Sequence, residues 1–278
     1  MHQFHAVALA TLGSLVLTQA AAADGIEVRK VQFLSGGNTV VGNLYLPAGR
    51  PGRTAQAAVA VVGPQSSIKE QVPAVYARRL AERGYIALAF DHRTFGESGG
   101  LPRQFENPAM KVEDIRNALT FLRALPEVKP TAVGLLGICS GGGYSARAAA
   151  ADPALAALVT VAGFYHDPAV MQQWLGENYR ARLELGKAAR IKYETTGTVD
   201  YMTNVDPADP KVAMPGAEAY EYYGTARGAQ PNWVNRSAVM FFEPFLQFNA
   251  IEAGAQIKAP TLVVHSDAAL VPEGARRF

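Results

Sequence analysis

The stretch LLGICSGGGYS (residues 135–145) places the one cysteine of the 278-residue chain between an apolar run and a glycine cluster. A tight turn from a strand into a helix exposes its central side chain only when the residues two positions away on either side are small. Cys139 meets this condition because Gly137 and Gly141 flank it, whereas centring the pattern on the following serine would put an isoleucine at the first small position. The stretch therefore predicts a cysteine nucleophile on a strand–turn–helix elbow. The alternative is a buried structural thiol on a glycine-rich turn.

Such an elbow also predicts where a developing oxyanion would be held. Ser140 begins the helix, so its backbone N–H can point at the oxyanion, and the positive end of the helix dipole is expected to lower the thiol pKa. A second donor is expected from the loop that follows the apolar run 57–63. Because Pro64 has no N–H, Gln65 is the predicted donor, with Ser66 behind it.

The order of apolar and polar runs predicts the fold class. Two alternating runs near the start of the mature chain are separated by SGGN (35–38), which predicts a hairpin. Further along, short continuous apolar runs, typical of strands buried on both faces, alternate with helical patterns. The apolar runs are 57–63, 85–90, 132–136, 155–163 and 260–265, and the helical patterns are 71–83, 111–125 and the segment after Gly141. This alternation predicts an α/β fold with a mostly parallel sheet flanked by helices.

The segment 168–258 breaks this alternation, with few strand-like runs, several helical pieces and many aromatic residues. We interpret it as a helical cap inserted between two sheet strands, so that residues 24–167 and 259–278 form the core. Most of its aromatic side chains are expected to pack the cap against the body. A few are expected to line a pocket, because lids over catalytic sheets supply apolar walls.

Two motifs resemble those of a known superfamily. GICSGG (137–142) resembles the nucleophile elbow of the alpha/beta-hydrolase superfamily in its dienelactone-hydrolase-like, cysteine form. DHRTFGES (91–98) resembles the superfamily's D-x-R-G-x-G-x-S loop, with one extra residue before the glycine. The order of the expected elements matches over nearly all of the mature chain. The resemblance implies a mixed sheet with the nucleophile near its centre, and a triad in the chain order nucleophile, acid, histidine.

The resemblance places the acid just past the strand that follows the cap. Asp267 occupies that place in PTLVVHSDAALVP (260–272). Alternatively, Asp267 is a turn aspartate that caps the helix expected near Pro272. Glu273 is a weaker candidate for the acid, since it fits better as a first-turn charge on that helix.

The triad histidine has no obvious position, because none follows Asp267 before Phe278. Of the five histidines, His2 and His5 fall in a predicted export signal. His265 lies in strand 260–265, and His92 lies in loop 91–98. His166 has the best topological claim, with Asp167 beside it, and a hinge histidine at the cap entry is the alternative. We expect instead that the superfamily's C-terminal strand, histidine loop and last helix are absent from this sequence. Their absence would leave strand 260–265 as an exposed apolar sheet edge.

Composition narrows the class of protein further. Hydrophobic residues make up 49% of the chain and charged residues 18%, with a net charge of +2, which is typical of a globular protein with a sizeable core. Lys and Arg do not cluster with aromatic residues, and no His, Cys or Asp group has metal-ligand spacing, so we expect neither nucleic acid nor a metal or other cofactor. Residues 1–23 are typical of a signal peptide cleaved near Ala23, which predicts a periplasmic or secreted protein with no membrane association beyond export.

These patterns together predict an acyl hydrolase in which Cys139 attacks an ester, lactone or thioester of a small molecule. One alternative is a catalytically impaired, hydrolase-like binding protein, and another is a truncated fragment that lacks the triad histidine. A prolyl-oligopeptidase-like peptidase or an acyltransferase is a weaker interpretation, since such peptidases normally use serine. The sequence carries no signal of oligomeric state.

Overall fold

The computed structural model describes residues 25–48 and 54–278, so the predicted signal peptide and its cleavage site near Ala23 lie outside the described residues. Seven strands form one sheet in the order β1-β2-β4-β3-β5-β6-β9. Their bounds are β1 (Glu27–Ser35), β2 (Asn38–Leu46), β3 (Gln56–Val62), β4 (Ile86–Phe90), β5 (Val128–Ile138), β6 (Leu158–Val161) and β9 (Thr261–Val264). β1 and β2 are antiparallel and the other five strands run parallel, which confirms the predicted α/β fold.

The local sequences explain both kinds of strand. The hairpin of β1 and β2 turns at Gly36 and Gly37, which both have positive φ, a conformation that glycine adopts without a steric penalty. All five residues of β4 are buried. Such a strand is stable only where helices cover both faces of the sheet, because its sequence is apolar throughout.

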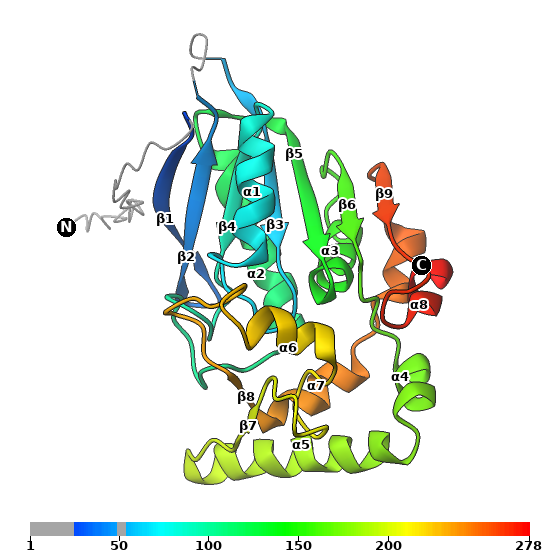
Figure 1. Cartoon of the computed structure of the whole chain (residues 1–278). Helices are drawn as coiled ribbons and strands as arrows, with labels where there is room; N and C mark the ends of the chain where they lie inside the picture. The colour runs from blue at the N-terminus through cyan, green and yellow to red at the C-terminus, as the bar shows by residue number, and fades with distance from the viewer. Residues whose placement is uncertain (1–24, 49–53) are drawn as a thin grey trace, which may run out of the picture.

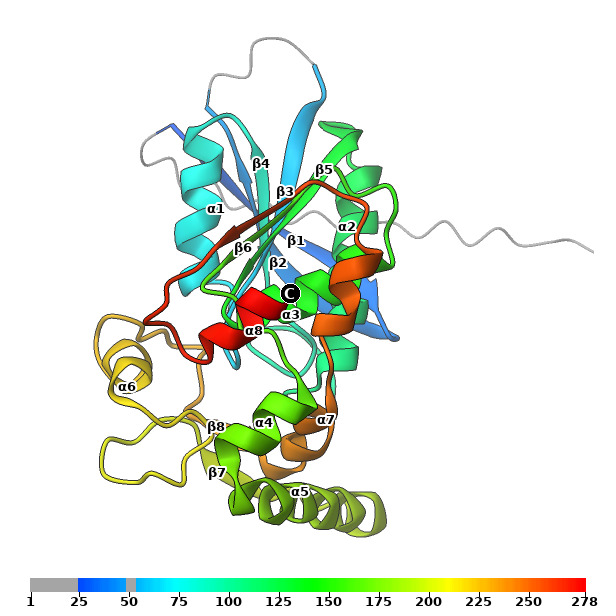
Figure 2. The ribbon, with the colours of Figure 1, turned by 90° about the vertical axis from the view of Figure 1, so that its right-hand side faces the viewer.

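Helices cover the sheet on both sides. Figure 2 shows α1 (Val72–Glu82) on one face and α2 (Pro108–Ala124) and α3 (Ser140–Ala150) on the other. Helix α2 begins at a proline and is capped by Asn107, whose side chain accepts a hydrogen bond of 3.2 Å from the Met110 N–H. The sheet and its helices bury two apolar clusters, one beneath α2 and α3 and the other beneath α1.

The segment 168–258 lies against the edge of the sheet where the parallel strands end (Figure 1). Its elements are α4 (Pro168–Leu175), α5 (Glu177–Thr196), β7 (Tyr201–Thr203), α6 (Ala217–Tyr223), β8 (Arg236–Ala238), η1 (Val239–Phe241), α7 (Phe242–Gln247) and η2 (Ile251–Gln256). Helices predominate, as predicted, and β7 and β8 add a small antiparallel pair. α5 packs closely on α7 at Gly186, where a Cβ atom would lie 2.7 Å from the Glu243 backbone nitrogen. The segment therefore has an apolar core of its own.

Strand β9 forms one edge of the sheet and pairs with β6. Among its apolar side chains, Leu262, Val263 and Val264 are 58%, 39% and 48% exposed. This exposed apolar edge agrees with the expectation for strand 260–265. Beyond it, α8 (Pro272–Arg277) packs near the end of β6, and the Phe278 ring stacks on Tyr165. Within the described part of the chain, no helix is both long and apolar enough to cross a bilayer.

Candidate active site

Cys139 stands at the bend between β5 and α3. Its backbone has φ 54° and ψ −127°, a strained conformation for a residue with a side chain. The flanking glycines are required by close backbone approaches. A Cβ on Gly137 would lie 2.4 Å from the Gly141 carbonyl oxygen, and one on Gly141 would lie 2.4 Å from the Val62 oxygen. The sequence condition for an elbow is therefore met for the expected steric reason.

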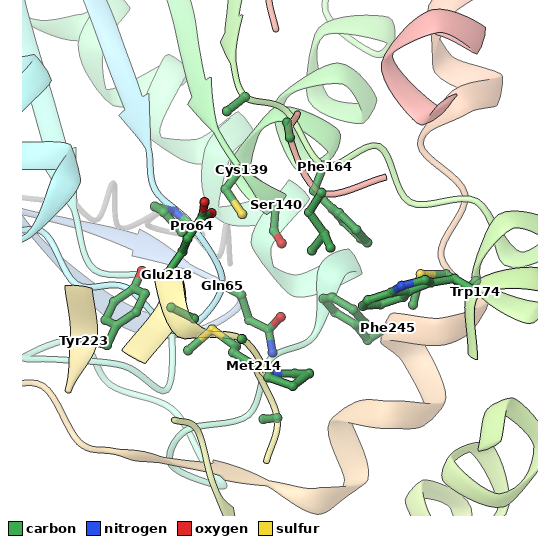
Figure 3. A pocket seen from close by; sticks show the side chains of 18 of the residues that line it. Pro64, Gln65, Cys139, Ser140, Phe164, Trp174, Met214, Glu218, Tyr223 and Phe245 are labelled. Carbon is green, nitrogen blue, oxygen red and sulfur yellow. The ribbon is translucent and has the colours of Figure 1, made fainter. Parts of the chain in front are cut away.

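Burial and neighbouring hydrogen-bond donors act on the Cys139 thiol in opposite directions. Burial raises the pKa of the Cys139 thiol, while hydrogen bonds from the Ser140 N–H and hydroxyl and from the Gln65 N–H act in the opposite direction. The expectation of a lowered thiol pKa is thus wrong, because desolvation by burial outweighs these hydrogen bonds. Cys139, Ser140 and Gln65 line one pocket and face one another in Figure 3. Their catalytic roles stay predictions.

A buried carboxylate fixes the loop that carries Gln65. Ser66 has positive φ, and its N–H donates to Glu106 Oε2 over 3.0 Å. The same carboxylate accepts from Lys111 Nζ and from the Tyr144 hydroxyl, each at 2.7 Å. Glu106, Lys111 and Tyr144 are all at most 2% exposed. Sequence patterns missed Glu106, because it lies in an irregular stretch and meets its partners only in the folded chain.

The DHRTFGES loop is tied down by a second buried network. Asp91 accepts from the Lys69 N–H at 2.7 Å and from Lys69 Nζ at 2.8 Å. Arg93 Nε donates to Asp114 at 2.6 Å, and His92 Nδ1 lies 3.2 Å from the same carboxylate. None of these five side chains lines the pocket of Cys139, so within the described structure they support the loop.

The predicted base, His166, is enclosed behind the site. It is fully buried, and its ring lies 5.1 Å from Tyr144 and 4.6 Å from Phe245 between ring centres. Neither ring nitrogen has a hydrogen-bond partner in the described structure, and burial lowers the His166 pKa to about 3. His166 is also absent from the lining of the Cys139 pocket. Its neighbour Asp167 caps α4 and pairs with Arg277.

The predicted acid, Asp267, points into solvent. Its carboxylate is 89% exposed and pairs with Arg276 at 2.6 Å. Two residues of the same loop, Ala269 and Leu270, do line the pocket. The structure therefore brings Gln65 and Ser140 to Cys139 but does not bring Asp267 or His166 there, and catalytic roles for the latter two stay predictions. The carboxylate of Glu273, the weaker candidate for the acid, has its Oε1 atom 3.8 Å from Arg276 Nη1.

The pocket has a volume of about 600 Å³ and largely apolar walls. The segment 168–258 supplies most of them, and Figure 3 shows Trp174, Met214, Tyr223 and Phe245 around the hollow that the elbow faces. Its apolar lining from this segment includes Met171, Trp174, Leu175, Met214, Tyr223, Phe241, Phe242, Phe245 and Leu246. Within residues 25–48 and 54–278, no three His, Cys, Asp or Glu side chains are grouped as metal ligands would be.

Comparison with known proteins assigns the chain to a family. The family model described as "Serine aminopeptidase, S33" matches residues 70–278. The chain belongs to this family of alpha/beta hydrolases. The superfamily implied by the elbow is thereby confirmed, and the protein is a hydrolase by family. Although the family is named for a serine enzyme, this chain has Cys139 at the elbow.

Three relatives show the range of the family. The chain is 33% identical over 258 residues to the uncharacterized protein PA2218 of Pseudomonas aeruginosa. This match covers 88% of this chain and 68% of that protein. The crystal structure of PA2218 superposes on this chain with a TM-score of 0.74 at 29% sequence identity. The match covers 90% of this chain and 84% of the chain in that crystal structure. The thiohydrolase aneE of Aspergillus aculeatus is 26% identical, covering 80% of this chain and 70% of that protein. The quorum-quenching protein AidA of Acinetobacter baumannii is 37% identical over a match that covers 67% of this chain and 62% of that protein.

Proposed function

We propose that this hydrolase cleaves esters, lactones or thioesters through an acyl-enzyme on Cys139. The Cys139 thiolate attacks the carbonyl carbon, and the oxyanion is held by the N–H groups of Gln65 and Ser140. The proton that the Cys139 thiol loses on attack is taken up by the leaving alkoxide or thiolate, and water then hydrolyses the thioester formed with Cys139 to the free acid and the thiol. The observation that carries this proposal is that Cys139 lies beside Gln65 and Ser140 on the lining of one largely apolar pocket.

Among these substrates, thioesters fit the proposed chemistry best. Transfer of the acyl group from a thioester substrate to Cys139 has a free-energy change near zero, because a thiolate is both the attacking and the leaving group. An amide is a poor substrate, since a thiolate leaves the tetrahedral intermediate more readily than an amine does unless a strong acid assists. The relationship to the thiohydrolase aneE supports this choice.

A second candidate function is a binding protein with the hydrolase fold. It is favoured by the state of His166, which is caged by aromatic rings and has a pKa lowered to about 3. Without a base, Cys139 would accept an acyl group once and release it slowly. His166 and Asp267 stay the predicted base and acid of the hydrolase.

Steady-state turnover separates the two functions. We expect the wild-type protein to hydrolyse N-acetylcysteamine thioesters and p-nitrophenyl esters over many cycles, and Cys139→Ala to lose at least about a thousandfold in rate. A single burst equal to the enzyme concentration would favour the binding protein. Undiminished turnover by Cys139→Ala would contradict both.

The base can be tested separately. If His166 deprotonates the attacking water, His166→Asn should retain the acylation burst and lose turnover. Unchanged turnover would exclude His166 as the base.

A further inference from the structure

The pocket of Cys139 contains an arginine that has no acidic partner. In the described part of the chain, two charged residues line the pocket, Arg182 on α5 and Glu218 on α6. The Arg182 guanidinium is half-buried and lies 5.3 Å from the centre of the Phe242 ring, which lines the same pocket. The aromatic contact holds the guanidinium at the pocket wall and leaves its N–H groups free to bind a ligand.

Another arginine of α5, Arg190, does have acidic partners, so the lack of one at Arg182 is not a general property of this helix. Arg190 is paired with Glu243 at 2.6 Å and with Glu194 at 2.8 Å. Among the described residues, no carboxylate lies within ion-pair distance of Arg182, and burial alone shifts its pKa downward. A cation that loses hydration without gaining a partner is destabilised, and a bound anion removes that penalty.

We propose that Arg182 binds a carboxylate carried by the acyl chain of the substrate. This inference rests on the proposed function, because it names a part of the acyl substrate. The planar fork of N–H groups on arginine matches both oxygens of a carboxylate. The acyl chain is the part of the substrate that stays in the pocket after the leaving group has gone. The apolar walls formed by Trp174, Phe242 and Leu246 suit a methylene chain that joins the carbonyl to the carboxylate.

A pair of thioesters tests this specificity. The monothioester of adipic acid with N-acetylcysteamine carries a free carboxylate, and its methyl ester is the neutral counterpart. We expect the wild-type protein to prefer the charged thioester by about tenfold or more in kcat/KM. Arg182→Gln should lose that preference by becoming slower on the charged thioester alone. Arg180→Gln, which removes an exposed charge from the same helix outside the pocket, should behave as wild type.

Three kinetic results would overturn the proposal. The first is equal use of both thioesters by the wild-type protein. The second is an equal loss on both by Arg182→Gln, which would indicate a structural role. The third is an Arg182-dependent preference for a carboxylate on the leaving group, measured with the hexanoyl thioester of thioglycolate and its methyl ester.

Binding without turnover distinguishes this proposal from the proposed function. Because Trp174 lines the pocket, its fluorescence should change when adipate is titrated into Cys139→Ala, and Cys139→Ala/Arg182→Gln should bind about tenfold more weakly. Arg182-dependent binding with no Cys139-dependent turnover would support the anion site and refute the proposed function. Cys139-dependent turnover with no Arg182-dependent binding would support the proposed function and refute the anion site.

Discussion

At the scale of single residues, the chemistry of the site depends on how deeply the thiol of Cys139 is placed. Burial keeps the thiol protonated beyond its ordinary pKa of 9.0, despite the neighbouring hydrogen-bond donors. Cys139 should therefore react slowly with alkylating agents at neutral pH.

Alkylation by iodoacetamide checks this state of the thiol. We expect the rate at pH 7 to be roughly tenfold or more below that of free cysteine, because the thiolate is the reacting form. The rate should still rise above pH 9. A rate that reaches its plateau below pH 8 would show a lowered thiol pKa and contradict this account.

The elbow tolerates no side chain at Gly141. A Cβ there would lie 2.4 and 2.5 Å from two backbone oxygens, of Val62 and Gly63, which cannot both move aside. Gly141→Ala is expected to lose activity and to lower the free energy of unfolding by about 3 kcal/mol. Gly99→Ala is the matched control, since its Cβ would make an ordinary contact of 3.5 Å. Equal urea midpoints for the two variants would contradict the steric argument.

His166 should make the protein sensitive to acid. Its pKa is about 3 in the folded protein against an ordinary value of 6.5, so the unfolded chain binds more protons between these values. Stability is therefore lost as the pH falls from 6.5 toward 3, by up to about 1.4 kcal/mol per pH unit. His166→Phe fits the aromatic cage and should flatten this dependence. Urea unfolding at pH 4 to 7 measures it, and parallel curves for both proteins would disprove it.

At the scale of structural elements, Glu106 joins three parts of the site. It accepts hydrogen bonds from the loop that carries Gln65, at Ser66, from α2 at Lys111 and from α3 at Tyr144. Because both Glu106 and Lys111 are buried, removing the carboxylate leaves an unpaired ammonium in the core. The network thus couples the position of the Gln65 N–H to the stability of the whole elbow.

Substitution of Glu106 should reveal both effects. Glu106→Gln is expected to lower the free energy of unfolding by about 3 kcal/mol and to reduce kcat more than it changes KM. Adding Lys111→Met should restore part of the stability, because the unpaired charge is gone, but not kcat. Chemical unfolding and steady-state kinetics on the three proteins test this. Full recovery of kcat in the double variant would remove Glu106 from the positioning of the loop.

Local sequence predicted elements well where one short stretch contains the whole cause. The strand expected at 132–136 lies inside β5, and the helix expected at 111–125 is α2, which starts earlier at Pro108 because Asn107 caps it. The strand–turn–helix elbow at Cys139 was predictable for the same reason, while the donor roles of Gln65 and Ser140 stay predictions. Glu106 and Arg182 were not predictable, since their roles arise from contacts between segments far apart in the chain. Asp267 followed from chain order alone, and order does not determine where a loop side chain points.

At the scale of the whole molecule, we expect the exposed edge strand β9 to affect solubility. Its exposed apolar residues present unpaired backbone groups to other chains, which favours aggregation. Leu262→Lys should reduce aggregation at high concentration, as measured by light scattering, with little change in the urea midpoint. An unchanged scattering signal would show that association uses another surface.

Export is the second prediction for the whole molecule. We propose that the chain is exported and cleaved after Ala23, so that the mature protein begins at Asp24. N-terminal sequencing of the protein from the periplasmic and extracellular fractions would show this. An intact Met1 in the cytoplasmic fraction would contradict it.

The central claim is that Cys139 carries the acyl group. Intact-protein mass spectrometry within the first turnover of a thioester, followed by peptide mapping, tests it most directly. We expect one acyl adduct per chain, located on Cys139 and absent from Cys139→Ala. An adduct on any other residue, with Cys139 unmodified while product forms, would contradict it.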